Sequence, residues 1–353
     1  MSATTSRPGA RRALLVLVVT ALAVAGCANI QPLPIPPIPV PHVVVRPKNA
    51  EPYVPKATTT TTLGNNQCTS SLKPAGPLPT AGSAAARAIL PAAAKRGRLV
   101  VGVGQDTLNW AYRDPTNDSL TGFDIQMLRQ VALAMFGSDD TNHLQFVVVP
   151  NANRAQAVST GQVDIVAETM TITCARQGLG TDPAKYPVDF SDVYYDARQL
   201  VLVPVNSSIN SEQDLAGKRV CATAGSTSIQ RLASLHLAHP VKAWQVENQT
   251  DCLVMLQQGQ VDAISTDDTI LAGLAAQDPK VKVLDFSLGD EPYGMAIAKS
   301  NPTFTRFVNA VLSQDRQNGT WAALWNRYLC PSGPDACPPS QVPAPPSPAP
   351  YKG

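Results

Sequence analysis

The sequence predicts an α/β fold in which helices cover mixed β-sheets. Two observations lead to this prediction. Within residues 92–330, short apolar runs alternate with stretches of helical hydrophobic spacing, and this segment holds only nine of the 32 prolines. Strand–helix alternation at an ordinary proline density is typical of α/β domains. The chain has 353 residues, a length that suggests about two domains.

Seven short apolar runs are the predicted strands, at 99–103, 144–149, 163–167, 200–205, 219–223, 263–265 and 293–298. The clearest helical pattern follows Asp124, a predicted N-cap, and places Ile125, Leu128, Val131 and Met135 on one face. Further helices are predicted at 226–237, 250–257, 303–312 and 321–328. In such sheets ligands bind beyond the carboxyl ends of strands, near helix N-termini, so candidate residues are sought there.

Residues 1–27 have the pattern of an export signal. Arg7, Arg11 and Arg12 precede an apolar stretch at 13–25 that is too short to span a bilayer. The run Val24-Ala25-Gly26-Cys27 resembles the bacterial lipobox, which implies that Cys27 carries two acyl chains and becomes the mature N-terminus. Two chains suffice for stable anchoring. The alternative is an ordinary secretory signal that contains a cysteine by chance.

The segments on either side of the predicted domain are rich in proline. Residues 28–91 contain thirteen prolines and a threonine run at 58–62, and they predict an extended tether. Residues 331–353 predict a disordered, proline-rich tail. Both segments offer too little apolar area to offset the entropy of ordering the chain.

Charge and motif content exclude several function classes. The whole chain has a net charge of +2, but residues 92–330 hold 19 basic and 24 acidic side chains, which argues against a nucleic-acid-binding domain. His236 and His239 lack the further ligands that a metal site needs. Since no dinucleotide fingerprint or serine-nucleophile motif is present either, we expect no metal, no cofactor and no catalytic residues.

A series of motifs, in order along residues 95–330, resembles the polar amino acid-binding proteins of ABC importers. This periplasmic-binding-protein family includes glutamine- and glutamate-binding members. With the lipobox and the tether, the chain is most similar to the actinobacterial lipoproteins of this type. The motifs are Leu99-Val-Val-Gly-Val103, Leu120-Thr-Gly-Phe-Asp124, Gly161-Gln-Val-Asp-Ile165, Met170-Thr-Ile-Thr173, Asp189-Phe-Ser-Asp192, Asp214-Leu-Ala-Gly-Lys218, Ala224-Gly-Ser-Thr227, Gln258-Gly-Gln-Val-Asp262, Thr266-Asp-Asp268, Glu291-Pro-Tyr-Gly294 and Asn318-Gly-Thr320.

The resemblance implies the two-lobed type II fold of periplasmic binding proteins, with a hinge of two crossing segments. Lobe one is expected at 92–199 and 297–330, and lobe two at 200–296. The crossings are then expected at 200–203 and 294–298. In this fold the lobes close over the ligand.

The resemblance also implies a set of residues for the carboxylate of a free amino acid. Arg176 matches the family arginine that forks onto the α-carboxylate, and Thr171 matches the threonine beside it. Backbone N–H groups at Ser226, Thr227 and Ser228 open a predicted helix and add donors. Ser226 also suits a plain N-cap, and both roles are compatible. Charge-assisted partners of this kind are required because burying an unpaired charge costs several kcal/mol.

For the ammonium group, Asp267 matches the family aspartate, and the carbonyl of Thr169 is a further expected acceptor. Trp110 lies where relatives place an aromatic ring over the ligand, although a core tryptophan is almost as consistent. Gln105, Asp106 and Thr107 lie in the first strand–helix loop, where Gln105 and Thr107 are expected to supply polar donors and Asp106 is the weakest candidate for a ligand contact.

Three positions depart from the pattern or leave the ligand's side chain open. Glu168 stands where many relatives have a small residue, and it suits either the ammonium or an arginine. Thr223 stands where some glutamine binders have lysine. Arg198 suits either an acidic side chain of the ligand or a salt bridge at the hinge. We therefore expect aspartate or glutamate first and asparagine or glutamine next. Arginine, lysine and leucine should be rejected.

Six cysteines remain after Cys27, and an exported protein with six cysteines is expected to form three disulfides, for which fifteen connectivities exist. Cys330 and Cys337 are close in sequence, and Cys221 and Cys252 fall in the same expected lobe. Cys68 and Cys174 pair by elimination.

The expected function is capture of a polar amino acid by a lipid-anchored protein on the outer face of the cell membrane. The expected partners are an ABC permease and its ATPase, with no nucleic acid. One alternative is a sensor subunit that signals to a membrane protein. Another is an enzyme on the same fold, for which Glu168 is the candidate acid.

Overall fold

The structure is a computed structural model that describes residues 45–55, 68–179 and 183–352. Of these, all from Arg46 onward belong to one compact unit. The predicted signal peptide and its Cys27 lie outside the described residues. In the described part of the chain, no helix is long and apolar enough to cross a membrane.

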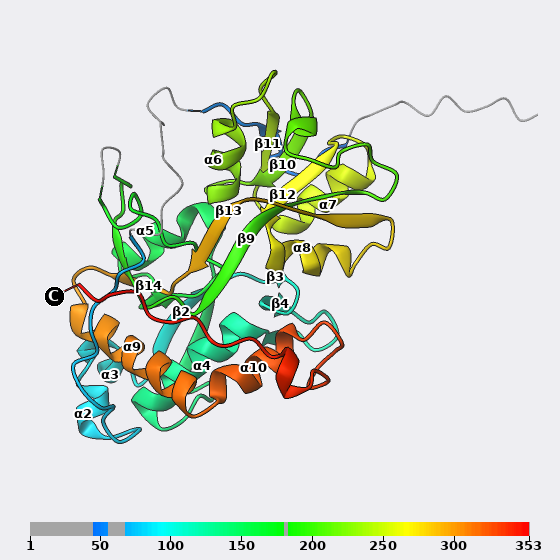
Figure 1. Ribbon diagram of the computed structural model, residues 1–353. Helices are drawn as coiled ribbons and strands as arrows, with labels where there is room; N and C mark the ends of the chain where they lie inside the picture. Colours follow the sequence, from blue (N-terminus) through cyan, green and yellow to red (C-terminus); the bar gives the residue numbers. More distant parts are fainter. Residues whose placement is uncertain (1–44, 56–67, 180–182, 353) are drawn as a thin grey trace, which may run out of the picture. The chain divides into compact units, whose positions relative to one another are not determined.

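Lobe one is built on a five-stranded sheet with the order β6-β2-β7-β14-β8, of which β2 and β14 are labelled in Figure 1. Its strands are β6 (Leu144–Val148), β2 (Leu99–Val103), β7 (Ile165–Val166), β14 (Ala296–Ala298) and β8 (Val188–Phe190). The first three run parallel, whereas β14 pairs antiparallel with both β7 and β8. A small three-stranded sheet lies beside them, formed by β3 (Asp106–Thr107), β4 (Ala111–Arg113) and β5 (Leu120–Thr121).

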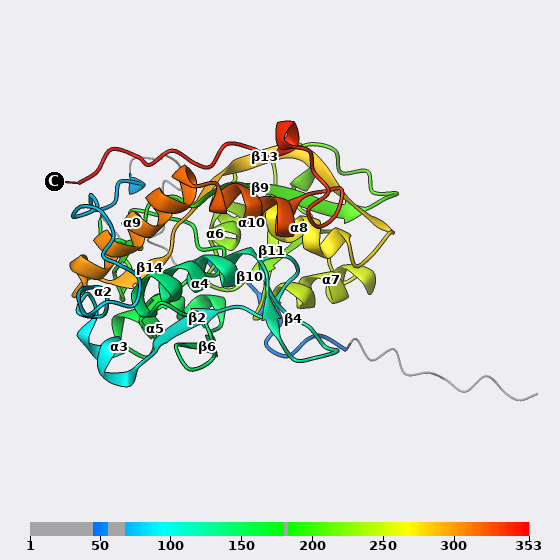
Figure 2. The same cartoon turned by 90° about the horizontal axis from the view of Figure 1, so that it is seen from below.

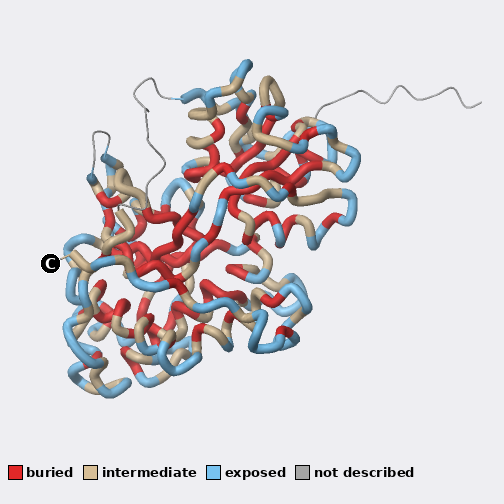
Figure 3. Tube along the Cα trace, in the orientation of Figure 1, coloured by how far each residue is buried: buried red, intermediate tan, exposed pale blue. Residues whose placement is uncertain are grey.

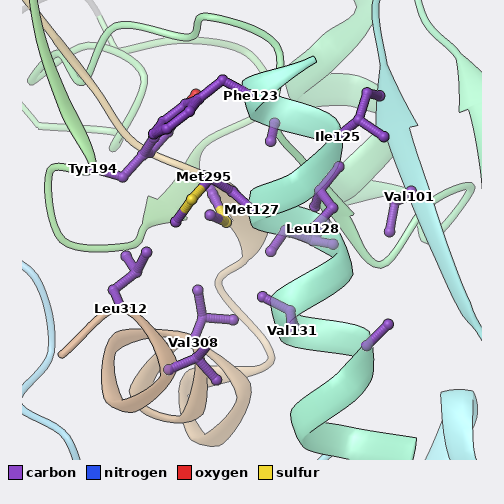
Figure 4. Packing of buried hydrophobic residues seen from close by; sticks show 14 of the residues in the cluster. Val101, Phe123, Ile125, Met127, Leu128, Val131, Tyr194, Met295, Val308 and Leu312 are labelled. Atoms are coloured by element: carbon purple, nitrogen blue, oxygen red, sulfur yellow. The ribbon is translucent and has the colours of Figure 1, made fainter. Parts of the chain in front are cut away.

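Helices cover both faces of the lobe-one sheet. Successive residues of a strand point to opposite faces, so neighbouring residues of one strand show what packs on each face. Ile165 packs in the cluster with α4 (Phe123–Phe136), α9 (Pro302–Gln317) and α10 (Thr320–Leu329), whereas Val166 packs in the cluster with α5 (Arg154–Ser159). Figure 4 shows Ile125, Leu128 and Val131 of α4 in the first cluster, and Figure 2 shows α4, α9 and α10 together. Helix α4 begins after Gly122, so Asp124 is not its N-cap.

Lobe two is built on a six-stranded sheet with the order β1-β11-β10-β12-β9-β13. Its strands are β1 (Glu51–Pro52), β11 (Lys242–Val246), β10 (Arg219–Thr223), β12 (Ala263–Asp267), β9 (Tyr195–Pro204) and β13 (Val281–Tyr293). Helices α6 (Thr227–Ser234), α7 (Gln249–Gln257) and α8 (Asp268–Ala275) pack on it. Leu202 and Val203 lie in separate apolar clusters, so both faces of this sheet are also covered.

Two long strands join the lobes. β9 and β13 pair antiparallel from Tyr195 opposite Tyr293 to Pro204 opposite Val281, and both run between the lobes in Figure 1. The chain therefore has the predicted two-lobed α/β fold with two crossing segments. Figure 3 shows buried residues concentrated along the strands and exposed ones in the outer loops. The predicted strand at 293–298 is in fact two elements, since β13 ends at Tyr293 and β14 begins at Ala296.

Part of the segment predicted to be a tether is packed against the domain. β1 pairs antiparallel with the edge strand β11, and the Arg46 guanidinium lies 4.9 Å from the ring centroid of Trp244. Further along, Ser71 Oγ donates to the Phe190 carbonyl at 2.6 Å. Two short helices, α2 (Ala84–Arg87) and α3 (Pro91–Arg96), follow. Composition did not predict this packing because a polar strand gains its hydrogen bonds from a sheet edge elsewhere in the sequence.

The predicted disordered tail also makes specific contacts. Tyr351 OH donates to Asp192 Oδ2 at 3.1 Å, and the Lys352 N–H donates to the Ser71 carbonyl at 2.8 Å.

Disulfides join Cys330 to Cys337, Cys221 to Cys252 and Cys68 to Cys174, the same pairs that the sequence led us to expect. The last of these links the N-terminal segment to the loop that carries Arg176.

Candidate functional site

Arg176, Thr171 and Thr227 meet where the two lobes touch. Arg176 extends from the loop after β7, and its Nη1 donates to the Thr171 carbonyl at 2.7 Å. Its Nη2 donates to the Gly225 carbonyl in lobe two at 3.1 Å. Thr227 is the first residue of α6, and its hydroxyl oxygen lies 3.3 Å from that of Thr171. The expected carboxylate-binding residues are thus brought together from both lobes.

Both threonine hydroxyls are bonded to a carboxylate of the protein itself. Thr171 Oγ1 donates to Glu291 Oε2 at 2.6 Å, and Thr227 Oγ1 donates to the same oxygen at 2.8 Å. Glu291 lies on β13 and is completely buried. Ser226 is the N-cap of α6, where its Oγ accepts from the Ile229 N–H at 3.1 Å and donates to the Thr223 carbonyl at 2.6 Å. The Ser226 hydroxyl is therefore used for capping.

Asp267 offers an unsatisfied acceptor at the same junction. It ends β12 with 3% exposure, and Tyr293 OH donates to its Oδ2 at 2.6 Å. Its Oδ1 has no hydrogen-bond partner within the described residues. Burial raises the pKa of Asp267, and the nearby charge of Glu291 raises it further. A cationic donor, such as an ammonium group, would satisfy Oδ1 and stabilise the ionised form.

Thr169 has a strained backbone at the start of the same loop. Its φ of +43° is unusual for a β-branched residue. Its N–H donates to Asp124 Oδ2 at 2.9 Å, and Tyr194 OH donates to Asp124 Oδ1 at 2.6 Å. Asp124 is fully buried, and burial raises its pKa to about 7. This buried network fixes the turn that carries the Thr169 carbonyl, and strained turns of this kind are common in binding sites.

Two buried charged residues, Glu168 and Arg154, lie beside this turn. Arg154 Nη1 donates to the Glu168 carbonyl at 2.6 Å, while Glu168 Oε2 has no partner within the described residues. Burial raises the pKa of Glu168 to about 8. Arg154 opposes this shift, whereas Asp106 and Asp124 add to it. Glu168 therefore resembles Asp267, since each holds a buried oxygen that an ammonium could satisfy.

Several predicted ligand contacts lie elsewhere. Gln105 is exposed and accepts from Arg113 Nε at 3.0 Å. Arg198 is exposed and its Nε lies 3.9 Å from Asp268 Oδ2, which favours the hinge salt bridge over a ligand contact. Thr223 donates its hydroxyl to Gln249 Oε1. In each case the side chain contacts a polar residue of the protein itself, and the sequence motifs did not reveal that partner.

Trp110 belongs to the lobe-one core. It is 1% exposed, and its ring packs edge-on against Phe123, Tyr195 and Tyr293, with centroid distances of 5.3, 4.7 and 5.5 Å. The sequence left two interpretations open for Trp110, a ring over the ligand or a core residue, and its surroundings are those of a core residue. Through Tyr293 it also supports the donor to Asp267.

Sequence reasoning assigned no role to Arg154, Tyr293 or Glu291, and it rated Asp106 a weak ligand contact. Asp106 Oδ2 accepts from the N–H groups of Gln249 and Thr250 at 2.7 and 3.4 Å. It thereby caps α7 from the other lobe, at a helix start where the N-cap residue Asn248 makes no capping bond with its own side chain. Glu291 and Tyr293 did belong to a recognised motif, but only the folded chain reveals their partners.

Three comparisons place this chain among known proteins. Residues 99–331 match the family described as bacterial extracellular solute-binding proteins, family 3. A glutamine-binding protein of Geobacillus stearothermophilus is 37% identical over 213 residues, which cover 60% of this chain and 77% of that protein.

Among solved structures, an ancestral arginine-binding protein bound to glutamine has a TM-score of 0.59 and 31% identity, covering 67% of this chain and 99% of that one. An ancestral amino acid-binding protein that is a precursor of cyclohexadienyl dehydratase has a TM-score of 0.58 and 32% identity, covering 66% and 96%.

We predict that Gly225→Ala opens the lobes. A Cβ on Gly225 would lie 2.5 Å from the Ala152 Cα in lobe one, and the φ of Gly225 is +73°. Gly259→Ala is the matched control, because Gly259 has a φ of +65° but nothing within 4 Å of its added Cβ. Small-angle scattering of the ligand-free protein should give a larger radius of gyration for the Gly225 variant alone. Equal radii for the two variants would contradict the prediction.

We predict that Glu168 makes stability fall as pH rises. Its folded pKa of about 8 exceeds its ordinary value of 4.5, so between these values the folded state holds a proton that the unfolded state releases. The free energy of unfolding should therefore decrease from about pH 5 to pH 8, and less steeply in Glu168→Gln. Denaturant unfolding at several pH values measures both slopes. Glu212→Gln, outside the junction, should keep the wild-type slope, and parallel curves for Glu168→Gln would refute the assignment.

Proposed function

The chain belongs to the bacterial extracellular solute-binding proteins of family 3, and from that premise we propose that it captures a polar amino acid for an ABC importer. The resemblance of its motifs and the named relative both support an amino acid as the solute. The permease and ATPase of the importer are the proposed partners.

The observation that carries the proposal is the pairing of opposite charges at the lobe junction. Arg176 contacts both lobes, and Asp267 holds a buried oxygen for which the described part of the chain supplies no donor. Burial and the neighbouring Arg154 lower the pKa of Arg176, while Glu291 and Asp267 oppose that shift. A zwitterion would supply an anion to the guanidinium and a cation to Asp267, which offsets the desolvation of both.

For the side chain of the ligand we propose a carboxylate first and an amide second. The expected donors Arg198 and Gln105 are engaged elsewhere, so Arg154 takes their place in this proposal. It is 3% exposed, and its hydrogen bonds within the described residues go to two carbonyls through Nε and Nη1. The second terminal nitrogen, Nη2, is therefore available to an acceptor on the ligand.

The test is calorimetry of the purified protein against all twenty amino acids, with Arg176→Ala and Arg198→Ala as a matched pair. Aspartate or glutamate should bind most tightly, their amides more weakly, and arginine, lysine and leucine not detectably. Arg176→Ala should lose about 3–5 kcal/mol, or roughly a hundred- to several thousandfold in affinity. Arg198→Ala should bind as the wild type does, because Arg198 is exposed and pairs with Asp268. Tight binding of lysine, or an unchanged Kd in Arg176→Ala, would overturn this pocket.

We propose that the captured solute is released unchanged. The glutamine-binding relative is a binding protein, although one structural neighbour is the precursor of a dehydratase. Glu168, with a pKa raised to about 8, is the candidate acid for any turnover. Recovery of intact amino acid after prolonged incubation with the protein supports binding without chemistry.

We also propose that the protein is anchored to the membrane through lipids on Cys27, which lies outside the described residues. The lipobox-like run before it motivates this proposal. Wild-type protein should sediment with membranes, whereas Cys27→Ala should be released or remain uncleaved. Mass spectrometry should find a diacylated N-terminal cysteine in the mature wild type. A free, unmodified Cys27 there would contradict the anchor.

A further inference from the structure

Glu291 occupies an unusual position for a carboxylate in a protein that is proposed to bind carboxylates. It lies on the crossing strand β13, opposite Ala197 of β9, and none of its surface is exposed. Its Oε2 accepts one hydroxyl from lobe one and one from lobe two, at 2.6 and 2.8 Å. These hydroxyls belong to Thr171, which the resemblance places beside the α-carboxylate of the ligand, and to Thr227, whose backbone N–H is expected to donate to the same carboxylate.

A counter-charge holds Glu291 in this place. Its Oε1 has no hydrogen-bond donor within the described residues, but it lies 3.5 Å from Arg231 Nη2. Arg231 lies on α6, and its side chain is 14% exposed. The guanidinium fits closely over Gly289, where an added Cβ would lie 2.5 Å from its Cζ. Glu291 is thus paired and hydrogen-bonded, as a buried carboxylate must be.

A threonine hydroxyl has one proton to donate. While Thr171 and Thr227 donate to Glu291, neither can donate to a carboxylate on the ligand. An incoming α-carboxylate would also lie near the negative charge of Glu291, which disfavours it. The same charge raises the pKa of Asp267 beyond the effect of burial, so it opposes the ionised form that an ammonium requires.

From these contacts we propose that Glu291 is an internal carboxylate that competes with the ligand for the hydroxyls of Thr171 and Thr227 and so sets a weaker affinity than the pocket could reach. This inference rests on the proposed function and names the residue that limits it. Arg176 and the backbone N–H groups of α6 are then the donors that remain for the α-carboxylate.

The experiment is calorimetry of wild type and Glu291→Gln with L-aspartate, L-glutamate and L-glutamine. Glu291→Gln removes the charge at nearly constant shape, and the Kd for whichever of these the wild type binds should fall about three- to tenfold. Glutamine keeps one acceptor oxygen, so the second background is Glu291→Met, which removes both oxygens. Thr171→Val should weaken binding at least threefold more in the Glu291→Met background than in the wild type, because the hydroxyl is free to reach the ligand only there.

Thermal unfolding of each variant checks that the fold is intact. If one of the two Glu291 variants does not fold, the other carries the test, since Glu291→Gln removes the charge and Glu291→Met removes the charge and both acceptor oxygens. An equal or weaker affinity in the folded variant overturns the role of Glu291 while the wild type still binds its amino acid. If the wild type binds none of the twenty amino acids, the proposed function fails instead.

Discussion

Charges that are buried where the two lobes meet dominate this structure, because an ionised group without a partner costs several kcal/mol in such surroundings. At the junction, nearby hydroxyl and backbone N–H donors offset this cost. The Tyr194 hydroxyl and the Thr169 N–H donate to Asp124. The Tyr293 hydroxyl donates to Asp267, and two threonine hydroxyls donate to Glu291. Within the described residues, Asp267 Oδ1, Glu168 Oε2 and Glu291 Oε1 have no hydrogen-bond donor at the junction. Glu291 Oε1 has Arg231 Nη2 at 3.5 Å, so Asp267 and Glu168 are the two positions where a cationic ligand group would fit.

The contacts across the junction also explain how lobe closure is coupled to the site. Arg176 bonds the Gly225 carbonyl, Glu291 accepts a hydroxyl from each lobe, and Asp106 caps α7 from the opposite lobe. A helix cap of this kind stabilises by about 0.5–2 kcal/mol. Separating the lobes would break all three contacts, so Asp106 and Glu291, which are not proposed ligand contacts, contribute to the energy of closure together with Arg176.

The N-terminal segment connects to both lobes outside the region that matches the family. β1 extends the sheet of lobe two, and Cys68 is bonded to Cys174 in lobe one, whereas the family match begins at residue 99. The described parts of this segment, residues 46–55 and 68–91, therefore belong to the folded domain. Its proline content predicted only an extended chain, because composition describes what a segment can bury on its own and not which sheet edge it meets.

The sequence by itself determined the α/β class, since hydrophobic periodicity is a local property of the chain. The resemblance of its motifs to a known family added the two lobes and the roles expected of Arg176, Thr171 and Asp267. The positions of the cysteines led to the three disulfide pairs that the structure contains. Only the tertiary structure decided which side chains reach one another. In the folded chain, Gln105 is hydrogen-bonded to Arg113, Arg198 is paired with Asp268, and Arg154 and Glu291 lie in the junction. A side chain's partner depends on groups more than a hundred residues away, as Thr171 and Glu291 show, and no local pattern carries that information.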